Sequence, residues 1–346
     1  MESDGSRLSD NMFMIAKIRE KCKRQSAENH VHFVKFFMRN TEVDMDNKTE
    51  SYTRTDLACE WARGGKKQEG THLHEQAWKH GSLQSLRICT EEASRRLERP
   101  VGEYVTVTCG PIWRLDKDEQ EELEGVVARV LSRMLRQETK KPIDGCLEVL
   151  VIGLGNSEIT ADAVGPQAVR ELLVTRHLKE QEPDIFRRME CCAVSALAPG
   201  VLGQTGMEVA EVVAGAVRRC HPDAIVAIDA LAARSCDRLA ATVQLSNAGI
   251  APGSGIGNDR CALDQKSLGV PVIALGIPTV VDSSTLVYDA LRQAGIGEVD
   301  ERLKKILENG RRFYVSPKES DMITSRTALL VAHAINRALV GVATLH

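Results

Sequence analysis

Short apolar runs alternate with longer segments of helical periodicity from about residue 100 to the end of the chain. The apolar runs predict strands at 102–110, 146–156, 193–197, 223–231 and 270–282. The other segments place hydrophobic residues three and four positions apart and predict amphipathic helices at 116–137, 162–178, 204–220 and 321–342. This alternation predicts a three-layer α/β/α fold, in which helices cover both faces of a mainly parallel, mixed central sheet.

The first hundred residues have a different pattern. Residues 1–50 are polar apart from a weakly amphipathic stretch at 31–40, so we expect an appendage with little share in the core. Residues 61–82 are polar and contain glycine, which predicts a loop.

The charge, the cysteine pattern and the hydrophobicity of the chain disfavour several classes of protein. The formal net charge of −3 gives no general reason to expect binding to nucleic acid or to a membrane. None of the 10 cysteines belongs to a C-x-x-C pair, which disfavours a zinc module and suits reduced thiols. No apolar stretch approaches the roughly 18–20 residues of a membrane span, and the first residues lack a signal peptide's basic start and apolar core. We therefore expect a soluble cytoplasmic protein.

The predicted strand at 146–156 ends in a glycine-containing turn. Gly153 and Gly155 match two positions of a dinucleotide-binding fingerprint, but its third position is Glu158. An acid at that position would repel a pyrophosphate, so the glycines are better explained by a sharp turn after the strand. We expect no cofactor.

Two aspartates follow or end predicted strands. Asp162 lies in the loop after the strand at 146–156, and Asp229 lies near the end of the strand at 223–231. The carboxyl ends of parallel strands share one edge, where ligands bind, so the two carboxylates can converge. One acid of such a pair can activate water while the other donates a proton. The alternative is that each aspartate caps a helix N-terminus, and spacing alone leaves both interpretations open.

Loops at the same predicted edge supply further candidates. The glycine-containing loops at 195–206 and 251–260 could line a substrate cleft, since backbone N–H groups can hold a peptide or an oxyanion. A flexible connection would have the same composition, and Arg234 could either anchor a carboxylate or carry surface charge. The candidate cleft residues are Asn156, Gly200, Arg234, Gly255 and Asn258. The sequence contains no G-x-S-x-G or H-E-x-x-H motif, so serine and zinc mechanisms lack support.

A series of motifs runs through the chain in a fixed order. They are TRTDLACE, VLVIGLGNSEITADAVGP, LLVTRHL, VSALAPGVLGQTGMEVAEVV, AIVAIDALAARS, PGSGIGN, GIPTVVDSSTLV and FYVSPKESDMI. Together they span roughly residues 52–340, and the chain resembles the germination protease, or spore protease, family of spore-forming bacteria. The resemblance implies an intracellular endopeptidase of an atypical aspartic type, made as a zymogen and assembled as a homotetramer. It also implies a fold similar to that of hydrogenase-maturation peptidases.

The same resemblance implies a substrate and a pair of catalytic residues. The family digests the small acid-soluble proteins that coat DNA in dormant spores, and does so in the spore core during germination. Its two proposed catalytic acids fall on Asp162 and Asp229, the pair that the predicted sheet already brings to one edge.

One motif resembles a substrate of the family. Family substrates are cut after an acid and before an apolar residue followed by Ala, with another acid downstream, and residues 56–60, DLACE, have this order. We therefore expect processing between Asp56 and Leu57. Residues 1–56 would then be an N-terminal extension and propeptide, and 57–346 a single α/β peptidase domain.

The N-terminal segment departs from the family pattern, because family propeptides are short. Either Met45 is the native start, or residues 1–44 are a lineage-specific extension.

Two other functions remain open at this stage. A metal-dependent maturation-type peptidase would use Asp162 and Asp229 as ligands, although no third ligand is evident on the same edge. A non-catalytic module that binds spore proteins would have little use for a self-cleavage sequence.

Overall fold

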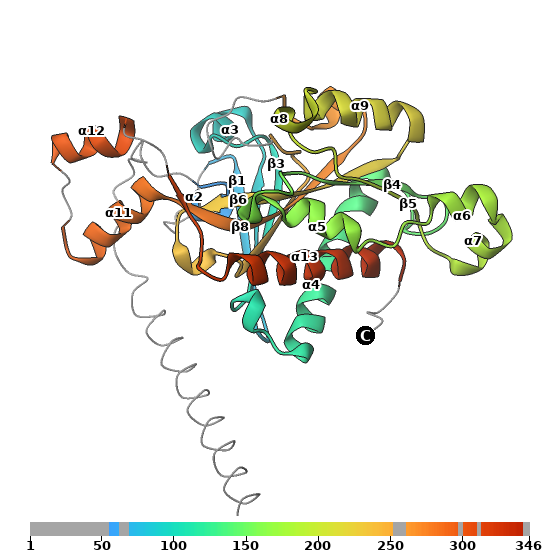
Figure 1. The fold of residues 1–346 in the computed structure, drawn as a ribbon, viewed down its shortest axis with the longest axis horizontal. Coiled ribbons are helices and arrows are strands. Elements are labelled where there is room, and N and C mark those ends of the chain that lie inside the picture. The colour runs from blue at the N-terminus through green and yellow to red at the C-terminus, as the bar shows by residue number, and fades with distance from the viewer. Residues whose placement is uncertain (1–54, 62–68, 252–260, 297–299, 310–312, 342–346) are drawn as a thin grey trace, which may run out of the picture. The chain divides into compact units, whose positions relative to one another are not determined.

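The computed structural model of this chain describes residues 55–61, 69–251, 261–296, 300–309 and 313–341 (Figure 1). The expected helical stretch at 31–40 and most of the expected loop at 251–260 lie outside these ranges. None of the helices within them combines the length and the apolar content that crossing a bilayer requires.

A nine-stranded sheet runs through the described residues, in the order β1-β2-β3-β7-β8-β6-β4-β5, with β9 paired to β8. The strands are β1 (Thr71–Trp78), β2 (Gly81–Ile88), β3 (Gly102–Thr108), β4 (Glu148–Gly153), β5 (Ala193–Leu197), β6 (Ala224–Ala233), β7 (Thr242–Ser246), β8 (Val272–Asp282) and β9 (Tyr314–Val315). Strands β8, β6, β4 and β5 are parallel, and the others join by antiparallel pairing. The expected α/β fold with a mixed sheet is confirmed.

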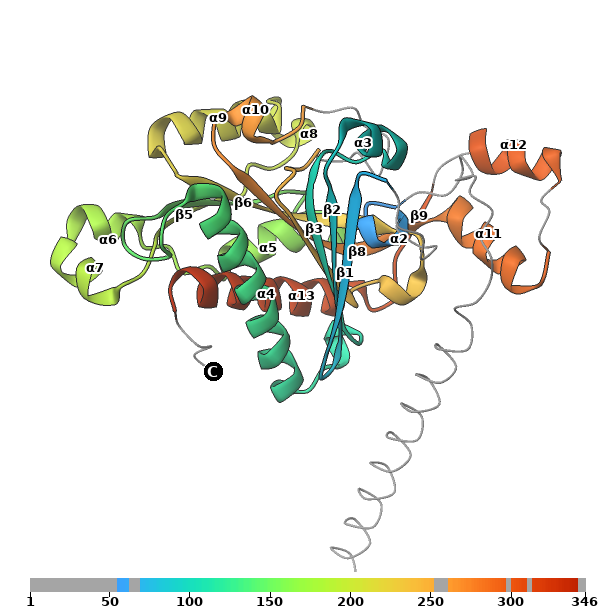
Figure 2. The ribbon, with the colours of Figure 1, turned by 180° about the vertical axis from the view of Figure 1, so that it is seen from behind.

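Helices connect and cover these strands. They are α2 (Ala58–Trp61), α3 (Glu91–Leu97), α4 (Lys117–Thr139), α5 (Val164–Arg170), α6 (Arg176–Gln181), α7 (Pro183–Met189), α8 (Leu202–Thr205), α9 (Val209–Cys220), α10 (Gln265–Leu268), α11 (Ser283–Gln293), α12 (Glu301–Asn309) and α13 (Ser320–Leu339), with short 3-10 turns η1 (Ile112–Arg114), η2 (Thr160–Asp162) and η3 (Cys236–Arg238). Figures 1 and 2 show α8 and α9 on one face of the sheet and α4, α5 and α13 on the other.

Strand β4 shows why the central strands are continuously apolar. Val149 and Val151 belong to the buried cluster that includes residues of α4, α5 and α13. Leu150 and Ile152 belong to the cluster on the opposite face, with Val209 of α9. Because both faces of the strand are buried, every position needs an apolar side chain.

Strand β1 lies where the sequence predicted a loop, and that prediction is wrong. β1 pairs with β2 along its whole length, from Thr71 opposite Ile88 to Trp78 opposite Gly81. It lies at the edge of the sheet, and most of its side chains are exposed. Its backbone hydrogen bonds form regardless of side-chain polarity, so an exposed edge strand can be as polar as a loop.

The helix expected at 162–178 is interrupted. α5 ends at Arg170 and α6 starts at Arg176. Between them, the buried Thr175 donates its hydroxyl to the carbonyl of Cys192 at 2.6 Å and its N–H to the carbonyl of Val194 at 3.0 Å. These bonds tie the chain to the start of β5, so the helical pattern cannot continue through this point.

Strand β6 extends beyond its neighbour β4. The two strands pair from Val149 with Ala224 to Gly153 with Ile228. β6 then continues to Ala233, later than the expected end at 231, and stays paired with β8 on its other side. The extension of β6 past β4 starts at Asp229 and forms part of the candidate site.

Candidate active site

Asp229 is a buried carboxylate within β6. The residue is 7% exposed, and its Oδ1 accepts a 2.9 Å hydrogen bond from the N–H of Ala230. Ile228 before it is fully buried, and Ala230 after it is partly buried. Burial of a carboxylate is costly unless other groups compensate, so an acid at this position is a candidate for chemistry rather than for packing.

Asp162 lies at the end of η2, in the connection between β4 and α5. Hydroxyl groups from two other elements hold this turn. Thr279 of β8 donates to the carbonyl of Ala161 at 2.7 Å, and Thr324 of α13 donates to the carbonyl of Thr160 at 3.0 Å. The position of Asp162 is therefore fixed from both β8 and α13.

The glycine turn after β4 also contacts Asp162. The N–H of Asn156 donates to Oδ2 of Asp162 at 2.7 Å. Gly155 has a φ of +113°, and a Cβ at this residue would lie 2.0 Å from the main-chain oxygen of Asp162. The sharp turn expected at these glycines thus holds the acid in place.

Neither acid caps a helix. Asp229 lies inside a strand, and the N-cap of α5 is Ala163, which makes no side-chain cap bond. The capping interpretation, which the sequence alone left open, is thereby excluded for both residues.

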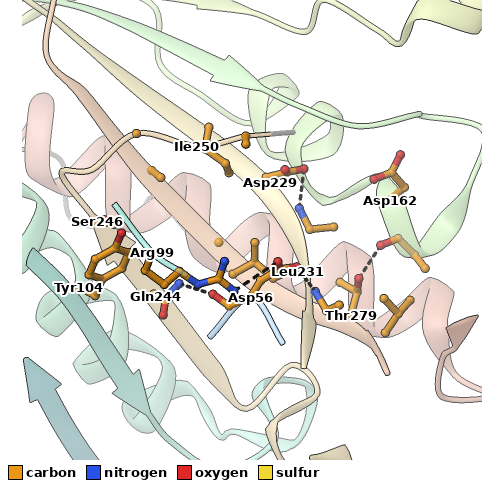
Figure 3. A pocket seen from close by; sticks show the side chains of 18 of the residues that line it. Asp56, Arg99, Tyr104, Asp162, Asp229, Leu231, Gln244, Ser246, Ile250 and Thr279 are labelled. Atoms are coloured by element: carbon orange, nitrogen blue, oxygen red, sulfur yellow. Dashed lines mark hydrogen bonds and ion pairs between the residues drawn. The ribbon is translucent and has the colours of Figure 1, made fainter. Parts of the chain in front are cut away.

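Both acids line one cavity of about 780 Å³ (Figure 3). Strands β6, β7 and β8 contribute to its lining, as do the η2 turn and residues near β3. Asp56, the first residue of the DLACE motif, also lines it. A concave site of this size, at the carboxyl ends of parallel strands, is typical of ligand binding in α/β proteins.

Residues 55–61 are packed against the protein beside these acids. The N–H of Asp56 donates to the carbonyl of Ala232, and the N–H of Ala232 donates to Oδ2 of Asp56, each at 2.8 Å. Ala232 belongs to the part of β6 that extends beyond β4. The segment is therefore attached to β6 three positions after Asp229.

The carboxylate of Asp56 has both a charged and a neutral partner. Burial raises the pKa of Asp56 above its ordinary value, and the Arg99 guanidinium and the N–H of Ala232 act in the opposite direction. Arg99 lies 4.0 Å from Oδ1 of Asp56 and also donates to the carbonyl of Thr55. Figure 3 shows Asp56, Arg99 and Gln244 grouped in one part of the cavity.

The other candidate cleft residues have different surroundings. Gly200 lines a separate cavity of about 250 Å³ together with Gly155. The guanidinium of Arg234 lies 3.9 Å from Asp289, and its Cζ lies 5.9 Å from the ring centre of Tyr288. Gly255 and Asn258 lie outside the described residues. Of the candidate cleft residues that are described, Asn156 is the one that contacts a candidate catalytic acid.

Sequence reasoning missed three side chains that hold residues 55–61. They are Arg99, Gln244 and Arg238, which come from distant parts of the chain and have no common local pattern. The sequence held one hint of these partners. If the acids of DLACE were buried, they would require cationic or N–H partners elsewhere in the chain.

Across the ranges that the structure describes, no three His, Cys, Asp or Glu side chains gather as a metal-binding set.

The fold and the cavity define an α/β protein with a carboxylate-lined cleft at the carboxyl ends of its parallel strands, where enzymes of this class bind their ligands. Comparison with known proteins identifies the kind of enzyme. The sequence model of the germination protease family matches residues 53–295.

Curated relatives agree with this match. The chain is 38% identical to the germination protease of Caldanaerobacter subterraneus subsp. tengcongensis over 311 residues, covering 83% of this chain and 94% of the relative. It is 37% identical to that of Clostridium acetobutylicum, with the same coverage. It is 36% identical to that of Priestia megaterium, covering 72% of this chain and 81% of the relative. The chain belongs to the germination protease family and is a peptidase, which confirms the resemblance seen in its motifs.

Proposed function

We propose that this chain is an endopeptidase zymogen that cleaves itself between Asp56 and Leu57 and then degrades small acid-soluble spore proteins. Asp162 and Asp229 form its catalytic pair. The observation that supports this proposal best is that Asp162, Asp229 and Asp56 line the same cavity.

The chemistry of the pair follows from the properties of two neighbouring carboxyl groups. The ionised member takes a proton from water, and the resulting nucleophile attacks the carbonyl carbon of the substrate peptide. The protonated member then donates its proton to the leaving amine as the C–N bond breaks.

Self-processing is supported by the contacts of the expected scissile bond. The carbonyl of Asp56 accepts a 3.1 Å hydrogen bond from Nε2 of Gln244. A donor on this oxygen orients the carbonyl and stabilises the negative charge that develops on it during attack. Gln244 is therefore a positioning residue for the Asp56–Leu57 bond.

The remaining parts of the proposal rest on family membership. Members bear the name germination protease, which supports spore proteins as substrates and the spore core as the location. The division into a propeptide at 1–56 and a peptidase domain at 57–346, the homotetramer, and activity without a cofactor, nucleic acid or membrane are proposed on the same basis.

The proposal is tested with a peptide that contains Glu-Ile-Ala-Ser-Glu. Once it has processed itself, the chain should cleave this peptide after the first Glu, and Asp162→Asn and Asp229→Asn should each abolish both self-processing and cleavage. Asp184→Asn on the exposed surface of α7 is the control and should retain activity. Cleavage by both amide variants would refute the proposed pair. Activity that is lost on chelation and restored by a divalent ion would instead favour the metal-dependent peptidase.

A further inference from the structure

The acid at position 56 has an N–H donor at one carboxyl oxygen and a guanidinium near the other. Its Oδ2 accepts the N–H of Ala232 at 2.8 Å, and the guanidinium of Arg99 lies 4.0 Å from its Oδ1. Arg99 also donates to the carbonyl of Thr55, so the same side chain contacts both the acid and the backbone before it.

The next two side chains occupy closed apolar sites. Leu57 is fully buried in a cluster with Leu231, Leu239 and Val281. Ala58 is fully buried in a different cluster, which includes Tyr104. A side chain larger than Ala at position 58 would force this second cluster to rearrange.

Gln244 fixes the register of the segment between these sites. Its Nε2 donates to the carbonyl of Asp56 at 3.1 Å, and its Oε1 accepts the N–H of Ala58 at 2.7 Å. One side-chain amide thus makes backbone hydrogen bonds on both sides of Leu57. A shift of the segment by one residue would break both bonds.

The acid at position 60 occupies a second carboxylate site. The side chain of Glu60 is fully buried, and its oxygens accept the N–H groups of Arg234 at 2.9 Å and Ser235 at 3.1 Å. Nε of Arg238 lies 3.3 Å from Oε1, and the hydroxyl of Thr55 donates to Oε2. The two backbone donors follow directly after the end of β6, and Arg238 belongs to η3.

We infer that these environments are the specificity sites of the enzyme and that residues 56–60 occupy them as a substrate would. Arg99 selects the acid before the cleaved bond, and Arg238 selects the acid four positions after it. Gln244 sets the spacing between the two. This inference rests on the proposed function, and it assigns the substrate specificity of that same site.

A purely structural role for the segment explains these contacts less well. Burial of a carboxylate for packing alone is unfavourable compared with an apolar residue of similar size. The segment nevertheless places Asp56 and Glu60 in sites with charged and N–H donors. The closed apolar sites of Leu57 and Ala58 lie between these two acids. This order of sites matches the order of residue types in the expected substrates. Substrate binding then requires residues 57–61 to leave the sites after processing.

The test compares matched peptides on the chain after self-processing, with mass spectrometry to check that each protein begins at Leu57. Cleavage is measured as kcat/KM for Glu-Ile-Ala-Ser-Glu, for the peptide with Gln at its last position, and for the peptide with Gln at its first position. The variants are Arg238→Gln and Arg99→Gln. Arg176→Gln, which removes an exposed ion pair on α6, is the control.

Each arginine variant should change one preference and leave the other intact. Arg238→Gln should reduce the preference for Glu over Gln at the last position by about tenfold, the effect of losing one charge-assisted contact. Arg99→Gln should do the same at the first position, and the control should change neither ratio. Unchanged ratios in both variants, with measurable cleavage, would overturn the inference while leaving the proposed function intact. Absence of self-processing, or of cleavage by the processed chain, would refute the proposed function itself.

Discussion

The N–H of Asn156 donates a 2.7 Å hydrogen bond to Oδ2 of Asp162, across the turn that follows β4. This bond connects the end of a central strand with a candidate catalytic acid. The turn is possible because Gly155 adopts a φ of +113°, a conformation that residues with a side chain rarely adopt.

The first prediction concerns this turn. Gly155→Ala should lower both stability and peptidase activity, because the new Cβ would lie 2.0 Å from the main-chain oxygen of Asp162. The expected loss of stability is about 1–3 kcal/mol, measured by urea unfolding, with a larger relative loss of kcat than of substrate binding. Gly215→Ala in α9 is the control, since no atom lies closer than 4.0 Å to a Cβ at that position. Normal activity of Gly155→Ala would show that the turn does not position Asp162.

The second prediction concerns the acid stability of the sheet. Burial tends to raise the pKa of Glu103, but hydrogen bonds from Arg133 and Ser85 outweigh it and lower the pKa below its ordinary value. Arg133 binds both carboxylate oxygens, at 2.9 and 3.0 Å. The resulting stability is present above the unfolded-state pKa of Glu103 and is lost as the pH falls through its lowered folded-state pKa.

Glu103→Gln should therefore destabilise the protein at neutral pH by about 1–3 kcal/mol, and this difference should shrink in strongly acidic buffer. Urea unfolding of both proteins across this pH range is the measurement. A difference that stays constant with pH would mean that packing, rather than charge, accounts for the role of Glu103.

The third prediction concerns the attachment of residues 55–61. Because the pKa of Asp56 is raised by burial, the protonated form favours the bound segment. Its contribution is fully present below the ordinary pKa of an aspartate and is lost as the pH rises through the raised value.

Mildly acidic buffer should thus increase the hydrogen-exchange protection of the Ala58 amide, which binds Gln244, after correction for the intrinsic exchange rate. In Asp56→Asn this pH dependence should disappear. Protection that decreases on acidification would contradict the expected sign.

The fourth prediction concerns the break between α5 and α6. The hydroxyl of Thr175 donates to the carbonyl of Cys192 at 2.6 Å and accepts the N–H of Val194 at 2.9 Å. Thr175→Val keeps the shape but leaves two buried backbone groups without this partner, which should cost about 1–3 kcal/mol. Thermal and urea unfolding measure the loss. Thr139→Val at the end of α4 is the matched control, because Thr139 is only partly buried. Equal effects of the two substitutions would refute this explanation.

The elements with the strongest local signals were predicted well. β4 lies inside the apolar run at 146–156, and α4 begins one residue after Asp116, which forms a capping box with Glu119. Both signals are local, because a continuous apolar run and a helix cap are each formed by residues close together in the sequence. The prediction failed at β1, since an exposed edge strand carries no hydrophobic pattern.

The candidate site was predictable in part. The two acids could be placed after or near the ends of strands, and the DLACE motif could be recognised from its order of residue types. The positions of the two acids and the motif relative to one another could not be predicted. They depend on β6 lying beside β4 and extending past it, which happens only in the assembled sheet. The contacts of Arg99 and Gln244 with Asp56 could not be predicted for the same reason. Arg99 lies just before β3 and Gln244 lies in β7, both far from Asp56 in the sequence.

The sequence by itself determined the positions of the central strands and long helices along the chain, the family, and the residue types of the DLACE motif, since each of these is encoded in neighbouring residues. The tertiary structure alone decided that Asp162, Asp229 and Asp56 share one cavity and that two arginines meet the two acids of the motif. The physical reason is that strand order and the unequal lengths of β4 and β6 arise from packing between distant segments, which no local pattern records.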